Sequence, residues 1–316
     1  MPKVPDGVRG GIITGWGTAL PPKVLTNYDL ELMFETSHDW IVDRTGIHQR
    51  HVGGNTTDLS VESGRKALEM SGVDLSTIDA LVLATTTPDR LVPASAPGIA
   101  NELGLSCGAF DVNAACSGFM YGLVMAHGLI AMGARNVLCI GTDTLARITD
   151  WTDRNTAILF ADGSGAVVLE SCAGAGELVG WDLDADGSAE RFLYAEVGGL
   201  LQMEGKEVFR RAVRIMVDSA TKSMNHAGVT ADDIALVVPH QANIRIISAA
   251  CERLGFPEEK RATVLHNTGN TSSASVPLAL CDALDAGRVK HGDLVLLVGF
   301  GAGMTAASAV LRWGGE

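Results

Sequence analysis

Residues 137–141 read Val-Leu-Cys-Ile-Gly and residues 295–299 read Val-Leu-Leu-Val-Gly, so two apolar runs that end at glycine stand 158 residues apart. Gly72, followed by an apolar run, has a similar counterpart in Gly228, at an offset of 156 residues. Both offsets are close to half of the 316-residue chain. Self-similarity at a fixed distance indicates a repeated structural unit. The chain is therefore predicted to contain two copies of one α/β unit.

Apolar, strand-like runs alternate with helical patterns along the whole chain, and the runs are apolar throughout. This pattern is typical of α/β sheets that are covered by helices on both faces. The predicted strands lie at residues 11–16, 80–84, 137–140, 166–169, 234–238, 294–298 and 308–311. The predicted helices lie at residues 60–70, 117–132, 207–226, 244–254 and 275–286. A Gly- and Ala-rich stretch at 171–180 interrupts the pattern, which places the two halves at residues 1–172 and 173–316.

Composition excludes several classes of protein. Hydrophobic residues make up 47% of the chain and charged residues 19%, which excludes intrinsic disorder. The net charge of −13 argues against an extended nucleic-acid surface. Residues 1–10 lack the apolar core of a signal peptide, and the longest nearly apolar run, 119–132, is too short to cross a membrane.

The cysteines and the motif content add further exclusions. The six cysteines form no C-x-x-C pair, so we expect reduced thiols in a cytoplasmic protein. The chain contains no H-E-x-x-H, Walker A or G-x-G-x-x-G motif, and its eight histidines are scattered. We therefore expect no metal and no bound cofactor.

Cys116 is the strongest candidate for a nucleophile. It lies in Asn113-Ala-Ala-Cys-Ser-Gly-Phe119, between a short predicted strand and the long apolar helix. A helix N-terminus favours a thiolate, and the small neighbours allow a substrate to approach closely. The alternative is a core cysteine among alanines, which is how we interpret the other five.

Two further loops carry polar side chains that suit acyl transfer. His240 ends a predicted strand in Pro239-His-Gln-Ala-Asn243, where α/β sheets place chemistry, and Asn270 precedes the helix at 275–286. Gly133 and Gly287, each ending a helix, are 154 residues apart, and the same offset places Cys116 on Asn270. His240 as a hydrogen-bonded loop residue and Asn270 as a helix cap remain open alternatives.

A glycine turn, Gly299-Phe-Gly-Ala-Gly303, follows the last long strand. It is either a tight turn or a source of backbone N–H groups for an anion. A cysteine nucleophile with neutral donors on neighbouring loops suits acyl transfer through a thioester.

These segments resemble the β-ketoacyl-acyl-carrier-protein synthase III family, condensing enzymes of the thiolase superfamily that start bacterial fatty-acid synthesis. The resemblance extends from residue 11 to residue 312. Its motifs are Ala115-Cys-Ser-Gly118, Pro239-His-Gln-Ala-Asn243, Gly269-Asn-Thr-Ser272, Phe300-Gly-Ala-Gly303, Trp40-Ile-Val-Asp-Arg-Thr-Gly-Ile47 and Thr152-Asp-Arg154. It implies a thiolase-like fold of two duplicated α/β halves in α-β-α-β-α layers, and a homodimer.

The resemblance also implies a mechanism. Cys116 would take an acyl group from acyl-CoA, and the enolate formed by decarboxylation of malonyl-acyl carrier protein would attack it. His240 and Asn270 would stabilise that enolate, and the backbone N–H groups of Cys116 and of Ala302 or Gly303 would form the oxyanion hole. Ala302 replaces a family glycine, and a positive φ there would be strained.

Binding roles follow from the same resemblance. The residues implied in CoA binding are Trp40, Arg44, Thr45, Arg154 and Asn243, and those implied in carrier-protein docking are Arg210, Arg214 and Arg245. Leu91 and Val92 would enter the acyl pocket of the partner subunit. Val92, in place of a bulky aromatic residue, hints at a roomy pocket. A solvated helix face is the alternative for the arginines on residues 207–226.

Other functions remain to be distinguished. One is a related starter or acyl-transfer ketosynthase of a polyketide or other secondary-metabolite pathway, which would share the same three residues. Another is a non-catalytic partner of a ketosynthase, which the presence of Cys116, His240 and Asn270 disfavours. A thiolase proper is disfavoured because no second cysteine occurs at residues 300–305.

Overall fold

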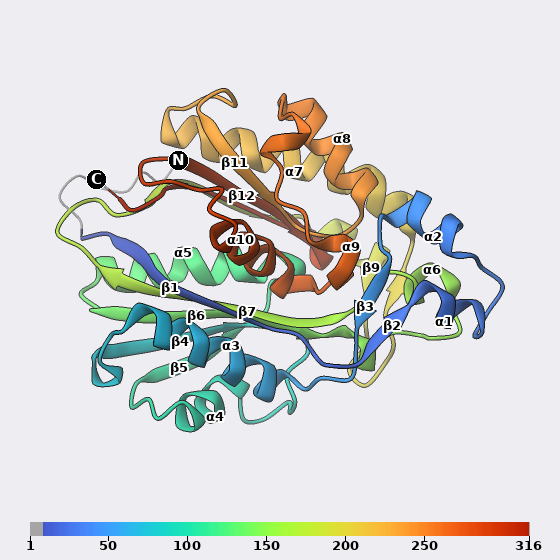
Figure 1. Cartoon of the computed structure of the whole chain (residues 1–316), viewed down its shortest axis with the longest axis horizontal. Helices are drawn as coiled ribbons and strands as arrows, with labels where there is room; N and C mark the ends of the chain where they lie inside the picture. The colour runs from blue at the N-terminus through green and yellow to red at the C-terminus, as the bar shows by residue number, and fades with distance from the viewer. Residues whose placement is uncertain (1–8, 316) are drawn as a thin grey trace.

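A computed structural model describes residues 9–315, and the chain forms five stacked layers in which two sheets alternate with helices (Figure 1). Residues 1–8, part of the segment expected not to be a signal peptide, lie outside the described residues, as does residue 316. Among the described residues, no helix is long and apolar enough to cross a membrane.

The N-terminal sheet has five strands in the order β1-β7-β6-β4-β5. Strands β4, β5 and β6 are parallel to one another, whereas β7 is antiparallel to both of its neighbours. Strand β5 is an edge of the sheet. The strands span β1 Gly11–Ala19, β4 Ile78–Ala84, β5 Gly108–Val112, β6 Asn136–Thr144 and β7 Asp162–Ser171.

The C-terminal sheet repeats this arrangement with four strands in the order β8-β13-β12-β11. Strand β11 is parallel to β12, and β13 is antiparallel to β12 and β8, so each strand matches one of β1, β7, β6 and β4 in place and direction. The strands span β8 Leu178–Ala185, β11 Ile234–Pro239, β12 Leu294–Gly301 and β13 Thr305–Arg312. The predicted duplication of an α/β unit is therefore confirmed at the level of the sheets.

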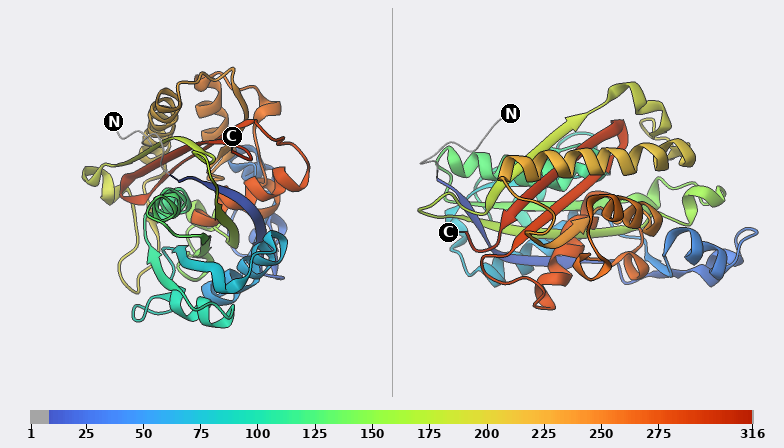
Figure 2. Two further views of the ribbon diagram at one scale, coloured as in Figure 1. Left: turned by 90° about the vertical axis from the view of Figure 1, so that its left-hand side faces the viewer. Right: turned by 90° about the horizontal axis from the view of Figure 1, so that it is seen from above.

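Helices fill the three remaining layers, each with its own apolar cluster. The middle layer is α5, Gly118–Ala131, and α10, Ser275–Asp285, and the left view of Figure 2 shows α5 end-on between the sheets. Helices α3, Thr56–Ser71, and α4, Ser95–Glu102, cover the N-terminal sheet. Helices α7, Gly205–Ala227, and α8, Ile244–Leu254, lie over the other sheet, as the right view shows for α7.

Shorter elements surround the ends of the strands that carry the site. They are β2 Val24–Thr26, α1 Asn27–Glu31, α2 His38–Thr45, β3 Gln49–His51, α6 Arg154–Ala157, β9 Leu193–Tyr194, β10 Gln202–Met203 and α9 Leu265–Thr268. The 3₁₀ turns are η1 Leu75–Thr77, η2 Ala115–Ser117, η3 Leu145–Arg147, η4 Gly187–Phe192, η5 Glu258–Lys260, η6 Ser272–Ala274 and η7 Ala302–Met304.

The repeat offset changes along the middle helices, which corrects one expectation. Helix α5 has 14 residues and α10 has 11, so the offset is 157 at their starts and 154 only at their ends. Ala115 and Ser272, each before a middle helix, both have positive φ, 48° and 51°, and confirm the offset of 157. The structural counterpart of Cys116 is therefore Ser273, and the expected match with Asn270 is wrong.

All seven predicted strands and all five predicted helices are present, with ends within a few residues of the expected ones. The pattern missed β8, which follows the interruption at 171–180. Its residues are partly exposed and include Asp182 and Asp184, so it lacks the continuous apolar run of a central strand. The proposed boundary at residue 172 falls between β7 and β8.

Candidate active site

Cys116 lies in the turn η2, directly before α5, and its side chain is buried. The turn is held from the other half, because the Thr305 hydroxyl donates to the carbonyl of Ala114 at 2.8 Å. A Cβ on Gly301 would lie 2.7 Å from the backbone nitrogen of Cys116, so this close approach requires glycine. The site is thus built where the two halves meet.

Burial raises the pKa of the Cys116 thiol from 9.0 to about 12. The Ser272 hydroxyl, which donates to Cys116 Sγ at 3.3 Å, lowers that pKa, and the Asp143 carboxylate adds to the rise. A rise of about three units corresponds to about 4 kcal/mol, whereas a helix N-terminus contributes at most about 2 kcal/mol. Burial therefore outweighs the thiolate preference expected from the helix end, and the thiol keeps its proton near neutral pH.

His240 follows β11 directly, as the sequence predicted, and only 1% of it is exposed. Its Nδ1 lies 2.6 Å from the Ser275 hydroxyl oxygen, and its ring makes an edge-to-face contact with Phe300. Burial lowers the pKa of His240 to about 3, so the imidazole is neutral at working pH. A neutral histidine donates from one ring nitrogen only.

Asn270 is held by both its backbone and its side chain. Its backbone N–H donates to the carbonyl of Leu159, and its carbonyl accepts from Ala161 N–H, which joins α9 to the N-terminal half. Its Oδ1 accepts from the Ser272 backbone N–H at 3.0 Å, so Nδ2 remains as the donor end of the amide. Asn270 lines the same cavity as Cys116 and His240.

The glycine turn after β12 accommodates Ala302, the alanine that replaces a family glycine. The positive φ of this turn, 124°, belongs to Gly303, and Ala302 is not among the described residues with positive φ. The turn lies beside Cys116, and both Ala302 and Gly303 line a cavity that reaches it. The strain that a positive φ would cause at Ala302 is therefore absent.

Two cavities reach Cys116 from different directions. One of about 690 Å³ contains His240, Asn270 and the mouth residues Trp40 and Arg245. The other, of about 590 Å³, is lined near Cys116 by Thr86, Ala302 and Gly303 and by the apolar side chains of Leu145, Ile148, Phe160, Leu193 and Leu201. Cys116 lines both cavities, so an acyl group on its sulfur could extend into one cavity while the carrier of that group leaves through the other.

The residues expected to bind CoA gather at the mouth of the larger cavity. Arg44 and Arg154 lie over the Trp40 ring, with guanidinium carbons 4.6 and 4.8 Å from its centroid. Arg154 also donates to the carbonyl of Glu35. An adenine inserted between Trp40 and Arg154 would need the guanidinium to withdraw from the ring.

Two of the expected CoA contacts already have structural tasks. The Thr45 hydroxyl donates to the Ile41 carbonyl and accepts from Ile47 N–H. Asn243 is the N-cap of α8, where Oδ1 accepts from Arg245 N–H, and Nδ2 donates to the Arg44 carbonyl. Both line the cavity, but their polar atoms hold α2 and α8 in place.

The arginines expected to dock a carrier protein do not form one cluster with the cavity. Arg245 lies at the cavity mouth and forms an ion pair with Asp43 at 2.7 Å. Arg210 is exposed on α7 and forms an ion pair with Glu207. Arg214 lines a separate cavity. Of these three arginines, only Arg245 therefore lines the larger of the cavities that contain Cys116.

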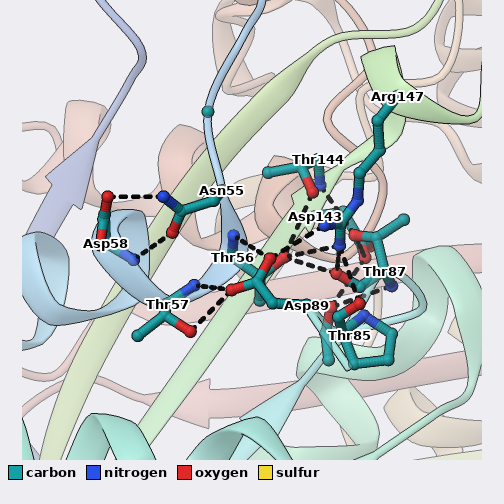
Figure 3. Close-up of polar contacts among 12 residues, drawn as sticks. Asn55, Thr56, Thr57, Asp58, Thr85, Thr87, Asp89, Asp143, Thr144 and Arg147 are labelled. Carbon is teal, nitrogen blue, oxygen red and sulfur yellow. Dashed lines mark hydrogen bonds and ion pairs between the residues drawn. The ribbon is translucent and has the colours of Figure 1, made fainter. Parts of the chain in front are cut away.

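Leu91 and Val92 are strongly exposed, 78% and 84%, at the tip of the loop after β4. The base of this loop is rigidly held (Figure 3). Asp89 accepts from the first backbone N–H groups of α3, at Thr56 and Thr57, and forms an ion pair with Arg147. Arg147 also donates to the carbonyl of Thr87. A base held by these contacts thus presents two apolar side chains to solvent.

Asp143, which the sequence did not reveal, connects this loop to the candidate active site. It is fully buried, and its Oδ1 accepts from the backbone and hydroxyl of Thr86 and from the hydroxyls of Thr85 and Thr87. Its Oδ2 accepts from the backbone N–H and hydroxyl of Ser273. Among residues 9–315, no group of three or more His, Cys, Asp or Glu side chains could hold a metal ion.

Comparisons with known proteins agree with this geometry. Residues 110–187 match the family model for 3-oxoacyl-[acyl-carrier-protein (ACP)] synthase III, and residues 224–313 match the model for its C-terminal part. A β-ketoacyl-[acyl-carrier-protein] synthase III from Bacillus cereus is 46% identical over 96% of this chain and 98% of its own length. The chain belongs to the β-ketoacyl-acyl-carrier-protein synthase III family. It is a condensing acyltransferase that initiates fatty-acid synthesis.

Solved structures show the same thiolase-like fold. The synthase III of Aquifex aeolicus has a TM-score of 0.94 and 40% identity, covering 96% of this chain and all of its own. The priming β-ketosynthase of the R1128 polyketide pathway has a TM-score of 0.93 and 34% identity, covering 98% of each chain. The fold is thus common to both pathways, and the higher identities favour the fatty-acid synthases over the polyketide alternative.

Proposed function

We propose that Cys116 carries the acyl group between the two half-reactions of this synthase. The thiol sulfur attacks the thioester carbonyl of acyl-CoA and loses its proton, the bond to the CoA sulfur breaks, and CoA leaves as a thiol. The backbone N–H groups of Cys116 and of Ala302 or Gly303 stabilise the oxyanion of the intermediate. The observation that carries the proposal is the position of Cys116 where two cavities meet, with His240 and Asn270 beside it.

In the second half-reaction, the malonyl thioester enters the larger cavity while the acyl carrier protein that bears it stays at the mouth. The bond to its carboxylate breaks and CO₂ leaves, while the electron pair moves onto the thioester as an enolate. His240 Nε2–H and Asn270 Nδ2 donate to the enolate oxygen, since both are neutral donors in a desolvated site. The carbanion then attacks the acyl-Cys116 carbonyl, and the thiolate of Cys116 leaves.

The binding surfaces extend the proposal. Trp40 and Arg154 hold the CoA nucleotide, and Arg245 contacts the acidic carrier protein at the cavity mouth. The smaller cavity takes the acyl chain, and its apolar lining suits a starter longer than acetyl. No prosthetic group is required by these steps.

A second copy of the chain would complete the smaller cavity. Leu91 and Val92 would enter it from the partner subunit, and the unpaired edge of β5 offers a strand for pairing. Homodimerisation and a cytoplasmic location complete the proposal, and sedimentation or light scattering would measure the oligomeric state.

Acylation by a series of acyl-CoAs, read as intact mass, tests the proposal. We expect one acyl group per chain in the native protein and none in the Cys116→Ala variant. Addition of malonyl-acyl carrier protein should release CO₂ and remove the acyl group. Acylation of the Cys116→Ala variant, or an acylated native protein that malonyl-acyl carrier protein does not discharge, would contradict the proposal.

A further inference from the structure

The hydrogen bond between Ser275 and His240 determines where the histidine carries its proton. Ser275 is the first residue of α10 and is fully buried. Its Oγ lies 2.6 Å from His240 Nδ1, and the backbone N–H of Gln241 donates to the same Oγ at 3.3 Å. Two groups, His240 Nδ1 and the Gln241 N–H, therefore share the hydroxyl of Ser275.

A serine hydroxyl has one proton to donate and two lone pairs. The Gln241 N–H uses one lone pair of Ser275. Within the described chain, Nδ1 is the acceptor within reach of the hydroxyl proton. If Nδ1 carried a proton and donated it to Oγ, the buried hydroxyl proton would lose its hydrogen-bond partner, which costs about 1–3 kcal/mol.

The arrangement therefore favours the tautomer with Nδ1 unprotonated and the proton on Nε2. The same ring is oriented by its contact with Phe300, and it lines the cavity that contains Cys116 and Asn270. We propose that Ser275 is a positioning residue that holds His240 as the Nε2–H tautomer. This inference rests on the proposed role of His240 as an enolate donor.

The inference predicts that Ser275 matters for one half-reaction more than the other. Decarboxylation needs the Nε2–H donor, whereas transfer of the acyl group to Cys116 uses backbone N–H groups. Ser272, in η6, donates to Cys116, and Ser275, at the start of α10, contacts His240, so two serines three residues apart support the two half-reactions separately. Loss of tautomer control costs a Ser-His-Asp triad about 10⁴-fold in kcat. A neutral serine should matter less, and we expect roughly a 10²-fold effect.

The test measures the tautomer directly and then both half-reactions. ¹⁵N NMR of histidine-labelled native protein should show His240 with Nε2 protonated and Nδ1 unprotonated, assigned by its loss in His240→Gln. Ser275→Ala should mix the tautomers and lower CO₂ release from malonyl-acyl carrier protein roughly 10²-fold, while acylation by acyl-CoA changes less than threefold. Ser275→Thr, which keeps a hydroxyl, should retain the native tautomer.

Ser223→Ala is the matched control, because Ser223 is a buried serine on α7 whose hydroxyl donates to the Ala220 carbonyl, away from the site. The inference is overturned if native His240 carries its proton on Nδ1, which is measured without any variant. It is also overturned if Ser275→Ala lowers both half-reactions equally. Failure of acylation at Cys116 itself would instead contradict the proposed function. The NMR measurement would still decide which tautomer of His240 is present.

Discussion

The hydroxyl of Ser272 donates a hydrogen bond to Sγ of Cys116 across 3.3 Å, and the two residues come from opposite halves of the fold. Ser272 is buried and lies in the turn η6 before α10, as Cys116 lies in η2 before α5. The turns contact each other. The C-terminal half therefore stabilises a charge that develops in the N-terminal half.

Replacing Ser272 by alanine should slow acylation of Cys116. The hydroxyl lowers the pKa of the thiol against the effect of burial, so its loss raises that pKa further. A hydrogen bond to a charged group contributes about 1.5–3 kcal/mol, which corresponds to about 10-fold or more in rate. The pH dependence of alkylation by iodoacetamide should shift to higher pH. An unchanged pH profile in a folded variant would contradict the prediction.

Gly301→Ala should displace Cys116, the proposed nucleophile, without unfolding the protein. The φ of Gly301, −143°, suits any residue, so the cost is one of space: a Cβ would lie 2.7 Å from the Cys116 backbone nitrogen and 2.9 Å from the Ala114 carbonyl oxygen. A displacement of about 1 Å can cost about 10²-fold in rate. Acylation measured by intact mass should fall accordingly.

The control for Gly301 is Gly128→Ala. Gly128 lies in α5, and a Cβ there would meet no atom within 4 Å. This variant should acylate at the native rate and be slightly more stable, by up to about 1 kcal/mol. Native activity in Gly301→Ala would show that the turn has room to adjust.

Arg245→Glu should raise KM for malonyl-acyl carrier protein about 10-fold or more, because reversal of a charge that faces an acidic partner changes the binding free energy by more than about 1.4 kcal/mol. Steady-state kinetics with each substrate varied in turn measures the effect. The acyl-CoA KM should change little. Equal effects on both substrates would instead indicate a general disturbance of α2 through the lost pair with Asp43.

Arg65→Glu is the comparison for carrier-protein docking. Arg65 is exposed on α3, which covers the other sheet. Its reversal changes the net charge by the same amount at a distance from the cavity mouth. The carrier-protein KM should therefore stay native in Arg65→Glu.

The stability of the protein should fall as the pH rises from about 4.5 to about 7 through one buried carboxyl group. Glu177 is fully buried, and burial raises its pKa from 4.5 to about 7, although the Gly314 and Ile13 backbone N–H groups that donate to it act in the opposite direction. The folded state therefore binds the proton more tightly than the unfolded state. This contribution is fully present below pH 4.5 and is lost by about pH 7, up to about 3 kcal/mol.

Urea unfolding of native protein and Glu177→Gln at pH 5 and pH 8 measures this contribution. The glutamine does not titrate, so its free energy of unfolding should differ less between the two pH values than that of the native protein. The quantity to compare is the change in the free energy of unfolding between pH 5 and pH 8. The absolute values are not comparable, because the amide replaces one acceptor oxygen with a donor and changes the stability by itself. If the free energy of unfolding depended on pH identically in the two proteins, groups other than Glu177 would cause that dependence.

The alternation of elements and the loops of the candidate site could be predicted from the sequence, because most strands are continuously apolar and the candidate residues lie in loops that follow strands or precede helices. His240 comes immediately after a strand-like run and Cys116 comes four residues after the end of one, and the structure places both in one cavity with Asn270. The exact repeat offset could not be predicted. Gly133 and Gly287 mark where the two middle helices end, but no residue type marks where they begin. The sequence therefore does not show that α10 is three residues shorter than α5.

The supporting side chains could not be chosen from the sequence alone. Ser272, Ser273 and Ser275 look equivalent in a serine-rich stretch, yet they contact Cys116, Asp143 and His240 respectively. Which serine faces which partner depends on how the two halves pack. In the same way, Asn243 resembles a ligand residue in the motif, but its side chain caps α8, which only the backbone geometry reveals.

Ala115 and Ser272, which precede the two middle helices, both have a positive φ, so the same backbone bend occurs once in each half of the chain. In one copy the next residue is a thiol, and in the other it is a serine bound to Asp143. The two bends share a backbone conformation but differ in side chains: one carries the thiol of Cys116, and the other supplies the Ser272 hydroxyl that donates to it. A nucleophile in place of Ser273 would therefore remove the hydroxyl that donates to Asp143, so the second bend is committed to support.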